Sequence, residues 1–365
     1  MKTIKINFTG LSIRSTFDPN NNYLLDLLKK YYDVVVCDDP DYVICGVLYP
    51  GASFCHGVYH EYILKYPCVR IMIEGENLIP DYNLVDYSIC QYPINYYDRN
   101  CYFPGGVEAF ANGHCYLRDL QDKDRNYPET ILKEKEYFAS FIASHESEYG
   151  IRGDFFKALN ARKRVESVGT YLNNMEDGKT VNWADGSKLD FQRKCRFSLC
   201  FESTKDEGFI TEKIVEAFYT DTIPIYYGSS NIKEIFNPKA FIDISDYPDF
   251  ESAIDRILEI EANETEYLEM LRQPIFVDPK YAEKKMAEVE AFLCHIFDQP
   301  LEKAYRRSRY LTQKDHEDFL KRSILRAEKL DIEGIRPKSD REIAWKYFRS
   351  IPRRIVRKLI GRKHK

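Results

Sequence analysis

Residues 195–228 read CRFSLCFESTKDEGFITEKIVEAFYTDTIPIYYG, and this stretch predicts one strand–helix–strand unit. The runs at 197–201 (FSLCF) and 222–227 (TIPIYY) are short and apolar, as in buried strands. Between them Thr211 stands where a helix N-cap belongs, and apolar residues recur at helical spacing to about Tyr219. Short strands joined by a helix predict a parallel sheet with helices on both faces.

The same alternation runs through most of the chain. Further strands are expected at 4–8, 34–37, 42–47, 69–73, 87–90, 136–143 and 241–244. The segment 98–135 is rich in Asp, Asn, Gly and Pro and predicts loops that contribute to an acceptor site. We therefore expect two doubly wound α/β domains, at 1–145 and 146–335, followed by a separate tail at 336–365.

Composition excludes several classes of protein. A length of 365 residues fits two domains, and 44% apolar with 30% charged residues excludes a mainly disordered or fibrous chain. The formal net charge of −5 argues against general nucleic-acid binding. Ten basic residues and one acidic residue lie at 341–365, so the other 340 residues carry −14.

The N-terminal stretch and the cysteines predict a cytoplasmic protein. MKTIKINFTGL has no apolar core typical of a signal peptide, and the ten cysteines form no CxxC pair. The uncharged stretch 42–60 contains Pro50 and is expected as a strand and a loop, not a membrane helix. No Asp or His cluster suggests a divalent metal, so neither metal nor cofactor is expected.

Two polar segments follow strands, where ligands collect in parallel sheets. Lys213 lies in the first turn of a helix, which disfavours a cation unless an anion such as a diphosphate is shared. The other interpretation is a solvated lysine beside an ordinary first-turn acid, Glu212. The second segment, 69–87 (VRIMIEGENLIPDYNLVDY), places Glu74 and Glu76 after a strand, as cleft carboxylates or as simple turn caps.

The quoted stretch resembles the signature of the α1,3/α1,4-fucosyltransferases, glycosyltransferase family ten, and its bacterial branch in particular. The resemblance extends over roughly residues 65–275 and rests on FES at 201–203, GFITEK at 208–213, IPIYYG at 223–228 and FNPKAF at 236–241. It implies a GT-B fold, with two Rossmann-like domains facing each other across a cleft. It also implies an acceptor bound mainly by the first domain, GDP-fucose bound by the second, and inversion at the fucose anomeric carbon.

The resemblance also implies a general base. The segment 69–87 is similar to the family's GEN motif, whose Glu is Glu76 here. Such a base takes the proton of the incoming sugar hydroxyl, and burial suits it by raising its pKa. Glu74 remains the competing candidate.

The remaining implied site residues surround the donor. Arg152 resembles the family arginine on the donor phosphates, and the alternative is a surface residue at a helix start. Glu212 would accept hydrogen bonds from the ribose or stabilise the fucosyl cation, and Tyr226 and Tyr227 would line the pocket or pack in the core. The expected donor-binding set is Arg152, Glu202, Ser203, Phe209, Thr211, Glu212, Lys213 and Tyr227.

Two positions depart from the family pattern, since Ser203 replaces its usual Asn and Phe209 its usual Tyr. Each change removes a polar contact near the donor. We expect transfer of L-fucose from GDP-β-L-fucose to the 3-hydroxyl of N-acetylglucosamine in lactosamine-type glycans, giving a Lewis-type product. Two alternatives remain open: a GT-B transferase that uses another nucleotide sugar, and a catalytically silent membrane- or glycan-binding protein. The joint presence of Glu76, Arg152, Glu212 and Lys213 argues against a protein without catalytic activity.

The tail at 341–365 predicts a basic amphipathic helix. Ala344, Phe348, Ile351, Ile355 and Leu359 share one face, and Arg and Lys fill much of the remainder. Such a helix lies on an anionic leaflet, so we expect a peripheral protein on the inner face of the membrane. A helix packed on the body and a disordered basic end are the alternatives.

Truncation after Asp340 should lower co-sedimentation with anionic liposomes, because it removes the basic and apolar faces together. Activity on soluble acceptors should persist. Equal liposome binding by the truncated and full-length chains would refute the membrane role.

Overall fold

The computed structural model describes residues 1–11, 17–48, 62–107, 109–182 and 185–332. It divides into two compact units, 1–307 and 308–365. In the second unit the described structure is helix α13 (Leu311–Ile332). The expected amphipathic helix at 341–365 lies outside the described residues. Among those described, no helix is both long and apolar enough to cross a membrane.

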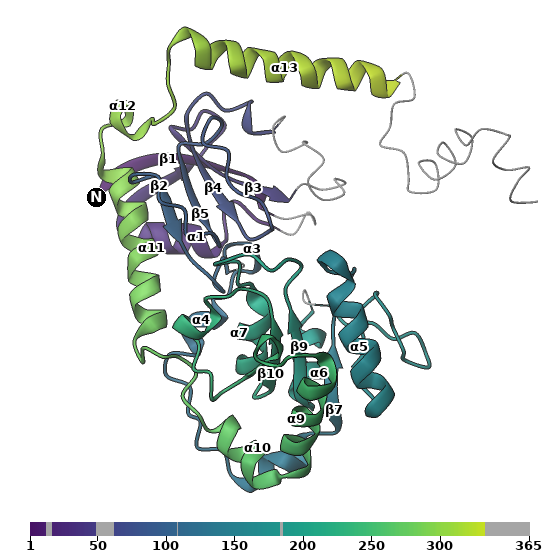
Figure 1. The fold of residues 1–365 in the computed structure, drawn as a ribbon. Helices are drawn as coiled ribbons and strands as arrows, with labels where there is room; N and C mark the ends of the chain where they lie inside the picture. Colours follow the sequence, from purple (N-terminus) through teal and green to yellow (C-terminus); the bar gives the residue numbers. More distant parts are fainter. Residues whose placement is uncertain (12–16, 49–61, 108, 183–184, 333–365) are drawn as a thin grey trace, which may run out of the picture. The chain divides into compact units, whose positions relative to one another are not determined.

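The first unit contains two fully parallel sheets (Figure 1). The first has the order β2-β1-β3-β4-β5-β6 and the second the order β11-β10-β9-β7-β8. The strands of the first sheet are β1 (Lys2–Leu11), β2 (Tyr32–Val36), β3 (Tyr42–Leu48), β4 (Val69–Glu74), β5 (Tyr87–Cys90) and β6 (Asn100–Tyr102). Those of the second are β7 (Tyr137–Phe141), β8 (Glu166–Ser167), β9 (Cys195–Phe201), β10 (Ile223–Tyr227) and β11 (Ile242–Asp243). The predicted doubly wound α/β class is confirmed.

Helices and short 3₁₀ turns connect the strands. The longer helices of the first unit are α1 (Tyr23–Lys29), α5 (Ile151–Arg162), α6 (Ser187–Arg193), α7 (Glu212–Tyr219), α9 (Phe250–Ala262), α10 (Glu264–Leu271) and α11 (Tyr281–Asp298). The shorter ones are α3 (Ala109–Asn112), α4 (Tyr116–Asp119), α8 (Ile232–Ile235) and α12 (Leu301–Ala304), with 3₁₀ turns at Glu129–Glu134, Glu148–Gly150 and Ile244–Asp246. The described residues of the segment 98–135, which is predicted as loops, contain only β6, α3, α4 and one 3₁₀ turn.

The sheet pairing corrects the predicted domain boundary. We expected residues up to 145 in the first domain, but β7 pairs with β8 and β9 of the second sheet. Phe138 and Phe141 on this strand are buried in the core of that sheet. The boundary therefore lies before Tyr137, since burial of its own aromatic side chains draws this strand into the second domain.

The chain also returns to the first sheet after completing the second, which the expected domain at 146–335 does not allow for. Helix α11 packs beside the first sheet, with the Phe297 ring 4.7 Å from that of Tyr42 (Figure 1). The Lys2 ammonium donates to the Phe297 carbonyl at 2.5 Å, and the Tyr32 hydroxyl donates to Asp298 at 2.9 Å. Residues near 290 thus complete the first domain.

A buried ion pair fixes the end of this returning segment. The guanidinium of Arg307 lies 3.0 Å from the Asp86 carboxylate, and neither side chain is exposed. The same carboxylate accepts from the backbone N–H groups of Arg70, Arg306 and Arg307, each at 2.8 Å. Because a buried charge is tolerated only when paired and hydrogen-bonded, this network holds residues 306–307 against the sheet.

Candidate active site

The order of strands in the second sheet reverses between β7 and β9, a point at which doubly wound sheets bind ligands. Arg152, in the first turn of α5, spans the segments that follow these two strands. Its guanidinium donates to the carbonyl oxygens of His145, at 2.7 Å, and Phe201, at 2.8 Å. Only 4% of the residue is exposed, so Arg152 is not a solvated residue at a helix start.

Glu202 follows β9 and organises the beginning of α7. Its carboxylate accepts from the Thr211 N–H at 2.8 Å and from the Thr211 hydroxyl at 2.7 Å. The same group lies 3.2 Å from the Lys213 ammonium and is fully buried. Glu202 therefore fixes both the N-cap and the cation of the helix.

Lys213 is held at the N-terminus of α7 by fixed partners. Its ammonium donates to the Thr211 hydroxyl at 2.8 Å and lies 3.8 Å from the Glu212 carboxylate. Burial would lower the pKa of Lys213, but the negative charges of Glu202 and Glu212 outweigh burial and raise it. The side chain thus provides a permanent cation at a helix end, where backbone N–H groups also favour an anion.

Glu212 is paired with two cations, of which the sequence suggested only one. Its carboxylate lies 3.8 Å from Lys213 and 3.7 Å from Lys188 on α6. Burial alone would raise the pKa of Glu212, yet these lysines lower it to about 2. Lys188 is the clearest residue that the sequence analysis missed; it stands in the first turn of a helix, the same signal that drew attention to Lys213.

The expected base segment follows β4 in the first sheet. Glu74 is 1% exposed; one oxygen accepts from the Glu76 N–H at 2.6 Å, and the other, Oε2, has no hydrogen-bond partner among the described residues. Burial raises the pKa of Glu74 to about 8. Burial and then the charge of Glu212 raise the pKa of Glu76, while Lys213 lowers it. Glu76 is therefore within electrostatic reach of the residues that begin α7.

Direct contacts also join the two segments. The Tyr92 hydroxyl donates to the Asn77 side-chain oxygen, next to Glu76, and to the Asp206 carboxylate at 3.2 Å. Its ring stacks on Phe209 at 5.7 Å between centroids, and Phe209 is 2% exposed. The aromatic ring at 209 is thus a packing surface for the phenol ring of Tyr92, a residue that no motif indicated.

The structure also places the remaining predicted residues. The Ser203 carbonyl accepts from the Glu148 N–H at 2.8 Å. Tyr226 is fully buried and its hydroxyl accepts from the Ser229 N–H, so it belongs to the core. Tyr227 is only partly buried; it stacks on Phe201, with the Lys205 ammonium 5.1 Å from its ring centroid. Among the described residues, no group of three or more His, Cys, Asp or Glu side chains could hold a metal ion.

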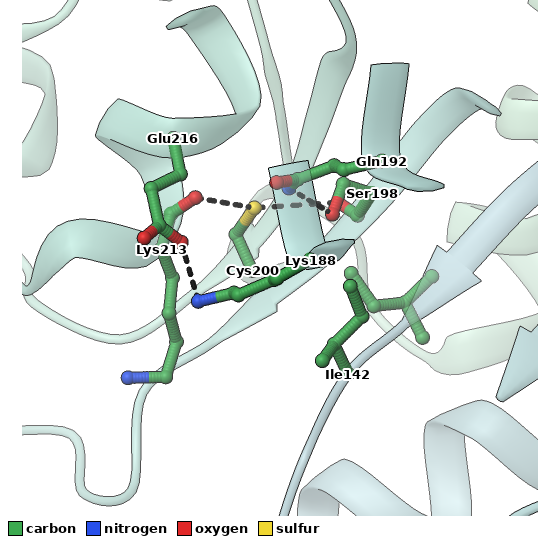
Figure 2. Close-up of a pocket in the computed structure, with 8 residues that line it drawn as sticks. Ile142, Lys188, Gln192, Ser198, Cys200, Lys213 and Glu216 are labelled. Carbon is green, nitrogen blue, oxygen red and sulfur yellow. Dashed lines mark hydrogen bonds and ion pairs between the residues drawn. The ribbon is translucent and has the colours of Figure 1, made fainter. Parts of the chain in front are cut away.

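A small pocket lies behind Lys213 (Figure 2). The Lys188 ammonium points across it to the Glu216 carboxylate, while the Lys213 side chain carries its ammonium away from that pair. The lining residues are Ile142, Lys188, Gln192, Ser198, Leu199, Cys200, Lys213 and Glu216. Behind the beginning of α7, Lys188 and Glu216 thus continue the series of charged side chains into the protein.

Two family models match the chain. The model for the C-terminal part of glycosyltransferase family 10 (fucosyltransferase) matches residues 132–314, which is half of the chain. The model for the N-terminal domain of the alpha-(1,3)-fucosyltransferase FucT matches residues 6–105. Between the two matches lie residues 106–131, in the segment where the chain passes from the first sheet to the second.

Individual proteins are similar as well. The alpha-(1,3)-fucosyltransferase FucT of Helicobacter pylori is 31% identical over 231 residues, which is 55% of this chain and 46% of that protein. The chain spans less than half the length of the curated relatives that it matches. A crystal structure of an alpha1,3-fucosyltransferase superposes with a TM-score of 0.63 at 24% identity, covering 85% of this chain and 93% of the other. One with GDP-fucose gives 0.60 at 24% identity, covering 80% and 91%.

These structural similarities confirm the predicted GT-B fold. The six-stranded and five-stranded sheets are its two Rossmann-like domains.

Glu74 gives the stability of the protein a distinctive dependence on pH. Its pKa is about 8 in the folded protein against an ordinary value of 4.5, so between these values the folded state keeps a proton that the unfolded state releases. The contribution of Glu74 to the free energy of unfolding is therefore fully present below pH 4.5 and is lost as pH rises toward 8, by roughly 1 kcal/mol per pH unit. Glu74→Gln, neutral at every pH, should remove this slope in urea unfolding at pH 6, 7 and 8.

The matched control is Glu264→Gln, because the Glu264 side chain is 67% exposed. This variant should follow the wild-type pH dependence. Parallel curves for the wild type and Glu74→Gln would show that Glu74 is ionised in the folded protein.

Proposed function

The chain belongs to the fucosyltransferases of glycosyltransferase family 10. We propose that it transfers L-fucose from GDP-β-L-fucose to the 3-hydroxyl of N-acetylglucosamine in lactosamine-type glycans. The transfer would invert the configuration at the fucose anomeric carbon. The observation that carries this proposal is the fixed ammonium of Lys213 at the N-terminus of α7, within electrostatic reach of Glu76. The donor follows from the family and from a similar fold crystallised with GDP-fucose. The 3-hydroxyl follows from the name of the Helicobacter relative.

The proposed reaction is a direct displacement. The acceptor oxygen forms a bond to fucose C1 while the bond from C1 to the β-phosphate oxygen breaks, and its electron pair leaves with GDP. Lys213, the N–H groups at the start of α7 and Arg152 would meet the negative charge that develops on the diphosphate. The backbone carbonyls that hold Arg152 fix its position before the donor arrives.

The acceptor proton would go to Glu76 and not to Glu74. Glu74 is buried, and its pKa of about 8 keeps it protonated at neutral pH, so it cannot receive another proton. It accepts from the Glu76 N–H and so holds the loop of the base. Glu76 is partly exposed, and burial raises its pKa toward the range suited to a general base.

Glu212 would face the sugar. The two lysines keep it ionised, so its negative charge is available to stabilise positive charge on the fucosyl group. No metal or cofactor takes part in this proposal. We also propose, on the sequence of residues 341–365 alone, that the protein works as a peripheral protein at the inner face of the membrane.

A donor screen tests the proposal. GDP-fucose, GDP-mannose and UDP-sugars would be offered with N-acetyllactosamine, and transfer should occur from GDP-fucose. Lys213→Ala should raise the donor KM and lower kcat, reducing kcat/KM roughly 10- to 100-fold, because a charged hydrogen bond is lost. Lys194→Ala is the matched control, since its side chain is 49% exposed and its ion pair is with the half-exposed Glu136.

Transfer from another sugar nucleotide would establish the alternative donor. GDP binding without transfer from any donor would favour the silent binding protein. Unchanged donor kinetics in Lys213→Ala would remove Lys213 from the phosphate site.

Glu76→Gln tests the base. We expect transfer to fall by about 10²- to 10⁴-fold, because no group accepts the acceptor proton, while GDP affinity measured by calorimetry stays as in the wild type. Glu74→Gln should retain most of the activity at neutral pH, where the wild-type residue is already neutral. The opposite result for the two variants would assign the base to Glu74.

A further inference from the structure

Lys188 lies at the start of α6, outside the motifs that carry the family resemblance, and contacts two carboxylates of α7. Its ammonium pairs with Glu216 across the pocket (Figure 2) and lies 3.7 Å from the Glu212 oxygen that also faces Lys213. The side chain is 16% exposed, so this cation has little water to replace its protein partners. Burial lowers the pKa of Lys188, but the charges of Glu216 and Glu212 outweigh it, and the lysine stays protonated.

We propose that Lys188 is a positioning residue, which holds the Glu212 carboxylate ionised and in place for the donor sugar. This inference rests on the proposed function, because it assigns Glu212 to the sugar. Two cations on different helices restrict the Glu212 carboxylate more than one cation would. Lys213 belongs to the same helix as Glu212, α7, whereas Lys188 reaches the carboxylate from α6. Glu212 therefore keeps a cationic partner when the fixed ammonium of Lys213 also contacts the diphosphate.

The charged groups that act on Glu212 come from several elements, so its ionisation is a property of the whole cluster. They are Lys213 and Glu216 on α7, Lys188 on α6, Arg152 on α5 and Glu76 after β4. Three of these groups are cations, and the Lys188 ammonium lies as close to the Glu212 oxygen, at 3.7 Å, as the Lys213 ammonium does, at 3.8 Å. Removal of its charge should therefore raise the pKa of Glu212.

The Glu216 pair offers a competing explanation, in which Lys188 only neutralises Glu216. Glu216 is 3% exposed, so Lys188→Met leaves a buried carboxylate unpaired and could damage the fold. The double variant Lys188→Met/Glu216→Gln removes both charges and keeps the volume. Glu216→Gln alone leaves Lys188 beside Glu212 and serves as the matched control.

Three measurements distinguish the explanations. In Lys188→Met and in the double variant, kcat for fucose transfer should fall about tenfold or more, because the carboxylate is displaced, while the Kd for GDP changes less than about twofold. Glu216→Gln should keep a kcat near that of the wild type. A ¹³C NMR titration of glutamate carboxyls, with Glu212 assigned by Glu212→Gln, should show its pKa raised by about one unit or more in both variants that lack Lys188.

Recovery of kcat and of the Glu212 titration in the double variant would overturn the proposal, since Lys188 would then serve Glu216 alone. A Kd for GDP weakened as much as kcat would also overturn it, since the lysine would then act on the diphosphate or on the fold. If the wild type transfers no fucose, the proposed function fails, and the Glu212 titration still decides whether Lys188 holds this carboxylate.

Discussion

A single buried carboxylate, that of Glu202, holds the beginning of α7 together. Its oxygens accept from the Thr211 N–H and hydroxyl and pair with Lys213, so backbone, cap and cation share one partner. An unpaired carboxylate at this depth would be costly, and each of these contacts offsets that cost. The hydrogen bonds and the ion pair of Glu202 form when the beginning of α7 folds. Folding therefore sets the position of Lys213 before any ligand binds.

The cost of burying a charged carboxylate also gives two neighbouring carboxyl groups different properties. Glu74 and Glu76 are two residues apart on one segment, but the first ends a buried strand and the second lies in the loop that follows. Burial keeps a proton on Glu74, and its oxygen then fixes the backbone of Glu76. Tyr92 adds a second constraint on this loop through Asn77 and packs against Phe209, in the segment between β9 and α7. Two segments from different sheets are therefore held at one site by hydrogen bonds and aromatic packing.

The sequence predicted those parts of the molecule whose causes are local. The strand at 197–201, the cap at Thr211 and the helix behind it follow from apolar spacing and capping chemistry, and the structure contains all three. The domain boundary and the return of α11 to the first sheet depend on contacts between residues far apart in the chain, which no local pattern encodes. Tyr92 was missed for the same reason, because its significance comes from partners on other elements. Lys188 does carry a local signal, its place in the first turn of a helix, but that signal gains meaning only from the carboxylates of α7 that it contacts.

The charge of the whole protein bears on how the site would bind an anion. The first 340 residues carry a net charge of −14, so the long-range field of this part opposes a nucleoside diphosphate. Within the cluster, the three carboxylates of Glu202, Glu212 and Glu216 balance the three cations of Lys188, Lys213 and Arg152, which leaves no net positive charge. Affinity for an anion must then come from the placement of the positive groups. One ammonium, one guanidinium and a helix N-terminus are fixed in place, and the carboxylates lie behind them. Such a site distinguishes one anion from another by the positions of their charges. A general attraction for anions would not suffice for this selectivity.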